Sequence, residues 1–138
     1  LLYERINLKR ERRFAPSAEA MDWSVACNEY EDAILHAGGL DLVFLSVGKD
    51  GSIAYNIGAP ELAPVTHVER TENGRVVTVG MTTVMSAKKV VALLVGSEKA
   101  ELAERIFNGP VTPQIPATYL LLHANTVFIL DEDAAVRI

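Results

Sequence analysis

The stretch that decides the fold reads Leu42-Val43-Phe44-Leu45-Ser46-Val47-Gly48-Lys49-Asp50-Gly51-Ser52-Ile53-Ala54-Tyr55-Asn56. Its first four residues are apolar, and such a short run is typical of a strand buried on both faces in a parallel α/β sheet. Sheets of this kind bind ligands in the crevice beyond the carboxyl ends of their strands. Gly48 and Gly51 allow a tight turn and a close approach of the backbone to a ligand, with Asp50 between them. The segment after the apolar run is therefore predicted to be an active-site loop.

Similar apolar runs predict the remaining strands. The first strand is expected over residues 40–47, the second over 90–95 and the third over 126–130, with a helix over 98–107 and a short helix from Pro116 to His123. Short strands at 66–69 and 75–79 flank a turn at 72–74, and residues 81–87 predict one or two helical turns. The alternation of apolar strands with helices favours an α/β layered fold with a mainly parallel sheet.

Residues 17–37 show the period of an amphipathic helix. Apolar side chains recur at i, i+3, i+4 and i+7, namely at Trp23, Ala26, Cys27, Tyr30, Ala33, Ile34 and Ala37. Gly38-Gly39 provides the left-handed C-terminal cap that would end this helix. Cys27 is the only cysteine, so an intramolecular disulfide is excluded, and its place on the stripe indicates a core residue rather than a nucleophile.

Composition excludes several classes of protein. With 138 residues, 49% hydrophobic and 22% charged, the chain predicts a single globular domain. A net charge of −5 gives no electrostatic case for binding nucleic acid or an anionic membrane, and the basic cluster at Arg5, Lys9, Arg10, Arg12 and Arg13 is interpreted as a solvated segment. No membrane-span run or signal peptide is found, so we expect a cytoplasmic protein, and the absence of an initiating Met indicates a piece of a longer one.

Two charged residues are candidates for chemistry. Asp50 is interpreted either as a carboxylate that handles protons beyond a strand end, or as an ordinary turn aspartate before glycine. Lys99 follows Gly96-Ser97 where a helix begins, with Ser97 as the expected N-cap. A lysine there would add its charge to a phosphate bound at the helix start, and the alternative is an exposed helix lysine.

The other polar residues give weaker signals. His36, His67 and His123 lack metal-ligand spacing, so no metal site and no cofactor are expected. His123 is interpreted as a core or interface residue. The acidic run at 131–133 is interpreted as a solvated turn and helix start.

Several of these motifs occur in the order in which one known family has them. They are Gly39-Leu40-Asp41-Leu42, the loop from Gly48 to Asn56, the segments 78–89 and 96–100, Leu121-Leu122-His123 and Leu130-Asp131-Glu132. On these residues the chain resembles the glucosamine-6-phosphate deaminase (isomerase) family, which is related in structure to the 6-phosphogluconolactonases. The resemblance runs from about residue 7 to residue 135.

The resemblance implies a Rossmann-like α/β domain over residues 1–138 that lacks the N-terminal half of the family's domain. Family members open the ring of an amino-sugar phosphate, isomerise it and release ammonia to leave fructose 6-phosphate. By similarity, Asp50 assists proton handling, Lys99 binds the substrate phosphate, and Ser46 and Gly48 line the sugar site. A small-molecule sugar phosphate is then the expected partner, and a homo-oligomer is the expected assembly.

Two positions depart from the family pattern. Ser52 occupies the catalytic position where the family has a ring-opening histidine, and Ile57 stands where the family has the glutamate that partners it. A hydroxyl cannot replace imidazole as an acid or base near neutral pH. The family's lid also carries a phosphate-binding arginine, and neither Arg70 nor Arg75 can be matched to it.

Three functions therefore stay open at this point. The first is a deaminase/isomerase-like enzyme acting on a hexosamine 6-phosphate in amino-sugar metabolism. The second is a sugar-phosphate-binding or regulatory module without turnover, which the residues at Ser52 and Ile57 favour. The third is a lactonase-type hydrolase, which is weaker because lactonases also use the loop histidine.

Overall fold

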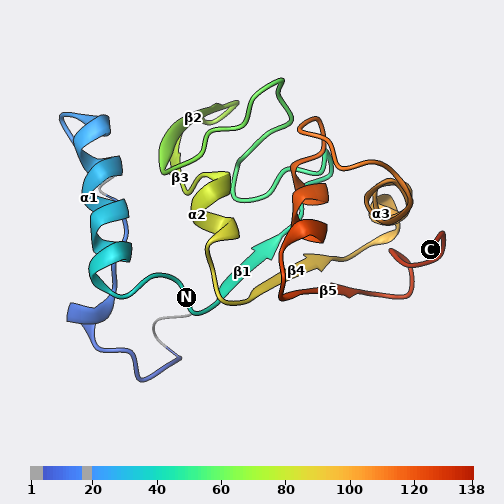
Figure 1. The fold of residues 1–138 in the computed structure, drawn as a ribbon, viewed down its shortest axis with the longest axis horizontal. Coiled ribbons are helices and arrows are strands. Elements are labelled where there is room, and N and C mark those ends of the chain that lie inside the picture. The colour runs from blue at the N-terminus through green and yellow to red at the C-terminus, as the bar shows by residue number, and fades with distance from the viewer. Residues whose placement is uncertain (1–4, 17–19) are drawn as a thin grey trace.

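A three-stranded parallel sheet forms the centre of the computed structural model, which describes residues 5–16 and 20–138. Its strands lie in the order β1 (Val43–Ser46), β4 (Val90–Leu94), β5 (Thr126–Leu130), as Figure 1 shows. Leu45 lies opposite Ala92, and Ala92 lies opposite Phe128. The prediction of an α/β fold with a mainly parallel sheet is confirmed, and all three strands end at the same edge of the sheet.

Helical segments and one hairpin precede or connect these strands. They are η2 (Arg10–Arg12), α1 (Trp23–His36), the antiparallel strands β2 (His67–Thr71) and β3 (Gly74–Thr78), α2 (Met81–Met85), η3 (Ser97–Lys99), α3 (Ala100–Asn108) and η4 (Pro116–Leu122). The hairpin turn falls where the sequence predicted it. Pro116 begins η4, because its fixed φ suits a first helical turn and its missing N–H costs nothing there.

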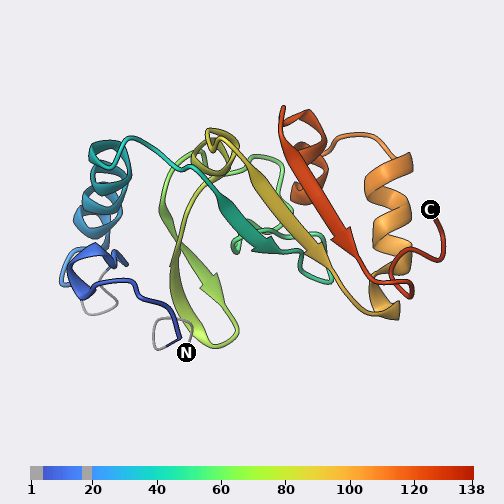
Figure 2. The same cartoon turned by 90° about the horizontal axis from the view of Figure 1, so that it is seen from below.

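One face of the sheet packs against the helical segments to form the core. Ala92 and Leu94 of the central strand are fully buried, together with Ile106 of α3 and Leu120 of η4. In Figure 1, α2, α3 and the helical turns before β5 all lie on the same side of the sheet. Figure 2 shows the three strands side by side, with α3 next to β5.

The opposite face of the sheet is open, so the prediction of strands buried on both faces was wrong. Phe44 is 63% exposed, and Val127 and Ile129 on the same face are 39% and 46% exposed. The apolar run predicted a strand correctly, but it could not tell how many layers cover that strand. Among the described residues, helices cover only one side of this sheet.

Helix α1 is shorter than predicted and lies beside the hairpin rather than on the sheet (Figures 1 and 2). It begins at Trp23 because the Asp22 carboxylate accepts hydrogen bonds from the N–H groups of Ser24 (2.9 Å) and Val25 (3.3 Å). Residues 17–19 of the predicted helix lie outside the described residues. Of the predicted apolar stripe, only Ala26 and Cys27 are buried, since α1 has a small partner surface.

The end of α1 matches the prediction. Gly38 and Gly39 have φ of +91° and +89°, a conformation that glycine adopts without steric cost. Their N–H groups donate to the carbonyls of Leu35 and Ile34, which closes the last turn of the helix.

The helix after β4 starts differently from the prediction. Ser97 begins the short η3 turn and makes no capping hydrogen bond, so its prediction as an N-cap was wrong. Lys99 occupies the N-cap position of α3 instead. The Asp131 carboxylate accepts from the Gly96 N–H in the turn before η3.

Candidate functional site

A hollow lies at the carboxyl end of β1, on the open face of the sheet. Its volume is about 480 Å³, and its lining residues are Phe44, Leu45, Ser46, Gly48, Ser52, Ala54 and Tyr55. The structure therefore brings together three of the five predicted site residues, Ser46, Gly48 and Ser52. Asp50 and Lys99 border the same loop without lining the hollow.

The loop after β1 is closed by its own hydrogen bonds. The Gly48 N–H donates to the Ser52 carbonyl (2.8 Å), and the Gly51 N–H donates to the Gly48 carbonyl (3.1 Å). The Asp50 carboxylate accepts from the Ser52 N–H at 3.0 Å. A Cβ atom at position 48 would lie 2.2 Å from Ser52 Oγ and 2.6 Å from Asp50 Oδ1, so a larger residue there would displace both side chains. Both polar side chains therefore lie against the part of the backbone that lines the hollow.

Asp50 is held in its charged form. Partial burial by itself raises the pKa of its carboxyl group. Hydrogen bonds from Ser52 and the positive charge of Lys99 lower this pKa by more than burial raises it, so the pKa lies below its ordinary value. An ionised carboxylate can accept a proton and cannot donate one. Asp50 is therefore a charged hydrogen-bond acceptor at neutral pH.

Lys99 is not the exposed helix lysine that the simpler interpretation expected. Only 8% of the residue is exposed, and its Nζ donates to the Val47 carbonyl at 2.7 Å. Burial lowers the pKa of Lys99, and the charges of Glu98 and Asp50 only partly oppose this shift. One of the three N–H donors of the ammonium group is therefore used by the Val47 carbonyl, directly after β1. It thereby ties the start of α3 to the end of β1.

The two positions that depart from the family pattern differ in their surroundings. Ser52 lines the hollow, whereas Ile57 is 41% exposed and is not among the lining residues. The Ser52 hydroxyl can donate and accept hydrogen bonds toward a ligand. The hollow thus offers a ligand hydroxyl groups, backbone and an aromatic ring, but no imidazole.

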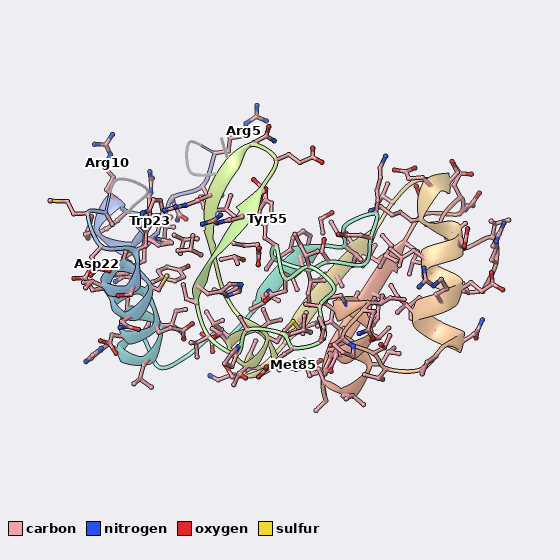
Figure 3. All side chains as sticks on the ribbon, turned by 90° about the horizontal axis from the view of Figure 1, so that it is seen from above. Arg5, Arg10, Asp22, Trp23, Tyr55 and Met85 are labelled. Carbon is pink, nitrogen blue, oxygen red and sulfur yellow. The ribbon has the colours of Figure 1, made fainter. Side chains whose placement is uncertain are left out.

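Sequence reasoning missed the turn that follows Ser52. Ala54 and Tyr55 have φ of +46° and +55°, and each such non-glycine residue costs about 1–2 kcal/mol. Tyr55 is 56% exposed, lines the hollow, and lies near the β2–β3 hairpin in Figure 3. The sequence signal was weak, since neither residue favours this conformation. The only hint was Asn56, whose side chain can bond to nearby backbone.

The histidines have structural contacts. His123 is half-buried: its Nε2 lies 2.7 Å from the Ala87 carbonyl, and its Nδ1 accepts from the Asn125 N–H at 3.1 Å. Cys27 is buried, as predicted, and burial raises the pKa of its thiol. Within residues 5–16 and 20–138, no group of three or more His, Cys, Asp or Glu side chains could hold a metal ion.

Asp131 joins the ends of two strands, so its prediction as part of a solvated turn was wrong. Its two carboxylate oxygens accept from the Gly96 N–H at 2.9 and 3.1 Å, and one also accepts from the Ala134 N–H at 2.9 Å. Gly96 follows β4 and Asp131 follows β5. A bond between residues 35 positions apart leaves no local pattern in the sequence.

Membrane insertion through a helix finds no support in the part of the chain that the structure describes. The longest helix, α1, has 14 residues, and none is long and apolar enough to cross a bilayer.

Comparison with known families gives a match over most of the chain. The family model described as glucosamine-6-phosphate isomerases/6-phosphogluconolactonase matches residues 1–129. Among curated proteins, the glucosamine-6-phosphate deaminase of Thermoanaerobacter pseudethanolicus is 34% identical over 96% of this chain. The glucosamine-6-phosphate deaminase of Rhodopirellula baltica is 35% identical over 97% of it.

Solved structures agree with this match. A monomeric glucosamine-6-phosphate deaminase superposes with a TM-score of 0.91 at 26% identity, and covers 98% of this chain. The 6-phosphogluconolactonase of Trypanosoma cruzi gives a TM-score of 0.72 at 20% identity over 88% of this chain, a likeness of fold alone. The chain spans 59–60% of the length of the two curated relatives and 63% of the deaminase structure.

Proposed function

This chain belongs to the family of glucosamine-6-phosphate isomerases and 6-phosphogluconolactonases, and from that premise we propose that it forms part of a glucosamine-6-phosphate deaminase. Its share of the active site is the loop after β1 together with Lys99. The reaction is the isomerisation of a hexosamine 6-phosphate with release of ammonia. The product and the assembly, expected to be a homo-oligomer, stay predictions.

One observation carries this proposal: Asp50 is kept ionised in the loop that borders the hollow, where its carboxylate accepts a hydrogen bond from the Ser52 N–H. Ring opening and isomerisation of an amino-sugar phosphate both require proton transfers. The resemblance gives the transfer between C1 and C2 to a carboxylate outside these residues, so the task proposed for Asp50 is to assist proton handling from the loop after β1. Its lowered pKa keeps the carboxylate charged at neutral pH.

The other residues divide the remaining tasks. Lys99 provides a positive charge for the substrate phosphate near the start of α3, and Ser46 and Gly48 form the floor of the sugar site. Ser52 donates a hydrogen bond to a sugar oxygen but cannot open the ring as a base. Ring opening is therefore expected to be the slow step in this protein.

The experiment is to measure ammonia release from glucosamine 6-phosphate by the full-length natural protein that contains this chain. Asp50→Asn keeps an oxygen for the Ser52 N–H but removes the base, so we expect a loss of about 10²–10⁴-fold in turnover. Asp133→Asn is the matched control, because Asp133 is exposed in the turn after β5. Equal turnover in the wild type and Asp50→Asn would rule out the assigned role.

A second function, binding without turnover, is favoured by Ser52 and Ile57, which stand where the family has its histidine and glutamate. It predicts no ammonia release, while glucosamine 6-phosphate still raises the melting temperature of the wild type. Lys99→Met should then abolish that rise. Release of ammonia that depends on Asp50 would exclude this second function.

A further inference from the structure

The turn at residues 53–56 is held in a conformation that its own residues disfavour. Ala54 and Tyr55 are consecutive non-glycine residues in the left-handed region, with φ of +46° and +55°. Such residues persist only where the surroundings fix them, and they occur often at ligand sites. The contacts that fix this turn therefore bear on the hollow that it borders.

The carboxamide of Asn56 is the main contact. Only 2% of Asn56 is exposed, and its Nδ2 group lies within hydrogen-bond distance of three carbonyls: Val79 (2.8 Å), Ile53 (3.0 Å) and Ala54 (3.3 Å). The Thr78 hydroxyl donates to the same Ala54 carbonyl. The turn is thus tied both to its own start and to the end of β3.

The other half of this carboxamide is unsatisfied. Within the described part of the chain, Asn56 Oδ1 is buried and accepts no hydrogen bond. Burying an oxygen without a partner is costly. An apolar side chain at position 56 would avoid the cost of the buried Oδ1 atom but could not donate to the three carbonyls. The conformation of the turn therefore depends on the Nδ2 group of Asn56.

The turn determines where the ring of Tyr55 lies. Ile53 is fully buried and Tyr55 is 56% exposed, so the left-handed turn sends the ring outward over the hollow that Ser46 and Ser52 line. Figure 3 shows Tyr55 between the hairpin and the central strands. An aromatic ring at the edge of a polar hollow offers an apolar face and attracts a cation such as the ammonium of an amino sugar.

We propose that Tyr55 contacts the bound amino-sugar phosphate and that Asn56 is the positioning residue that holds Tyr55 over the hollow. This inference rests on the proposed function, because it takes glucosamine 6-phosphate as the ligand. Asn56 itself touches no ligand and acts only through the backbone of residues 54 and 55.

A double-mutant cycle tests this dependence in the full-length natural protein. Tyr55→Ala and Asn56→Ala should each raise the dissociation constant for glucosamine 6-phosphate about tenfold, and the double variant should also raise it about tenfold rather than a hundredfold. Asn125→Ala is the matched control, since Asn125 Nδ2 also donates to one backbone carbonyl (Lys88, 3.0 Å) but away from the hollow. Independent, multiplying losses would overturn the positioning role.

A milder variant covers the case in which Asn56→Ala does not fold. Thr78→Val keeps the shape of the side chain but removes its hydrogen bond to the Ala54 carbonyl. We expect a smaller rise in the dissociation constant, which disappears when Tyr55 is already alanine. A rise of equal size in both backgrounds would contradict the proposal.

Hydrogen exchange separates this inference from the proposed function. Without any ligand, Thr78→Val or Asn56→Ala should speed exchange of the Asn56 N–H, which donates to the Ile53 carbonyl at 2.8 Å. Unchanged exchange would overturn the positioning role. If the wild type does not bind glucosamine 6-phosphate, the proposed function and the Tyr55 contact both fail, whatever the exchange shows.

Discussion

Replacing Glu31 with glutamine should destabilise the protein, because this one carboxylate fastens α1 to the rest of the structure. Its Oε1 accepts from the Thr66 N–H (2.7 Å), the Thr66 hydroxyl (2.5 Å) and the Thr83 hydroxyl (2.7 Å). Thr66 precedes β2 and Thr83 lies in α2. Both threonines are buried, at 5% exposure each, so water cannot easily replace the lost contacts.

The expected size follows from these three bonds. A hydrogen bond to a charged group stabilises by about 1.5–3 kcal/mol, and a neutral one by about 0.5–1.5 kcal/mol. Glutamine keeps an acceptor oxygen, so Glu31→Gln loses only the difference between a bond to a charged oxygen and a bond to a neutral one. Because the three bonds share one oxygen, we expect the total loss to be about 2 kcal/mol rather than the sum of three separate bonds. For a chain of this length that corresponds to a fall in melting temperature of about 6–10 °C.

The pH dependence gives a sharper test. Burial by itself raises the pKa of Glu31, but the hydrogen bonds from Thr66 and Thr83 outweigh it and leave the pKa below the ordinary value of a glutamate. A carboxyl group with a lowered folded pKa stabilises fully above its unfolded pKa and loses that contribution as the pH falls through the folded pKa. The stability gap between wild type and Glu31→Gln should therefore be constant near neutral pH and should shrink below about pH 4.5.

The assay is urea unfolding of wild type and variant at a series of pH values from neutral to acid. Glu29→Gln is the matched control, because Glu29 lies on the same helix and is exposed. We expect that control to change stability by less than about 0.5 kcal/mol. A gap that stays constant down to acid pH, or a control that destabilises equally, would refute the assignment of this carboxylate as the anchor of α1.

Three further predictions concern the candidate site. Gly51→Ala should lower the urea midpoint more than the control Gly38→Ala: both glycines have positive φ, but a Cβ at 51 meets a side-chain atom at 2.5 Å and one at 38 meets nothing within 4 Å. Equal midpoints would contradict this. Ser52→His combined with Ile57→Glu should raise ammonia release by about 10²-fold or more, and no rise in a folded, substrate-binding variant would exclude the missing imidazole as the cause of slow turnover. Lys99→Met should weaken binding of inorganic phosphate. It should also move the acid limb of the pH–rate profile to higher pH, because the charge of Lys99 lowers the pKa of Asp50. An acid limb at the same pH in the variant would refute that coupling.

The features that the sequence predicted correctly are local ones. The run at residues 42–45, the turn glycines at 48 and 51 and the paired glycines after α1 act within a few residues, so their pattern is visible in the chain. Ser46, Gly48 and Ser52 were assigned to one site by the family resemblance, and the structure places all three around one hollow.

The features that the sequence could not predict depend on distant contacts. Phe44 reads like a core residue, and only the arrangement of layers leaves it exposed. Ser97 is a residue type typical of an N-cap, yet the helix begins after a short η3 turn in which its side chain makes no capping bond. The left-handed backbone at Ala54 is imposed by the end of β3, and propensity alone would have placed a glycine there.

The carboxyl ends of the three parallel strands are connected in series. Lys99 joins the end of β1 to the start of α3, and Asp131 joins the end of β4 to the end of β5. Loops joined in this way fluctuate as one cooperative unit rather than as three independent segments. A ligand that reduces the mobility of the loop after β1 would then also slow motions around residue 131, at the opposite end of the series. Binding in the hollow would thus change the mobility of all three strand ends.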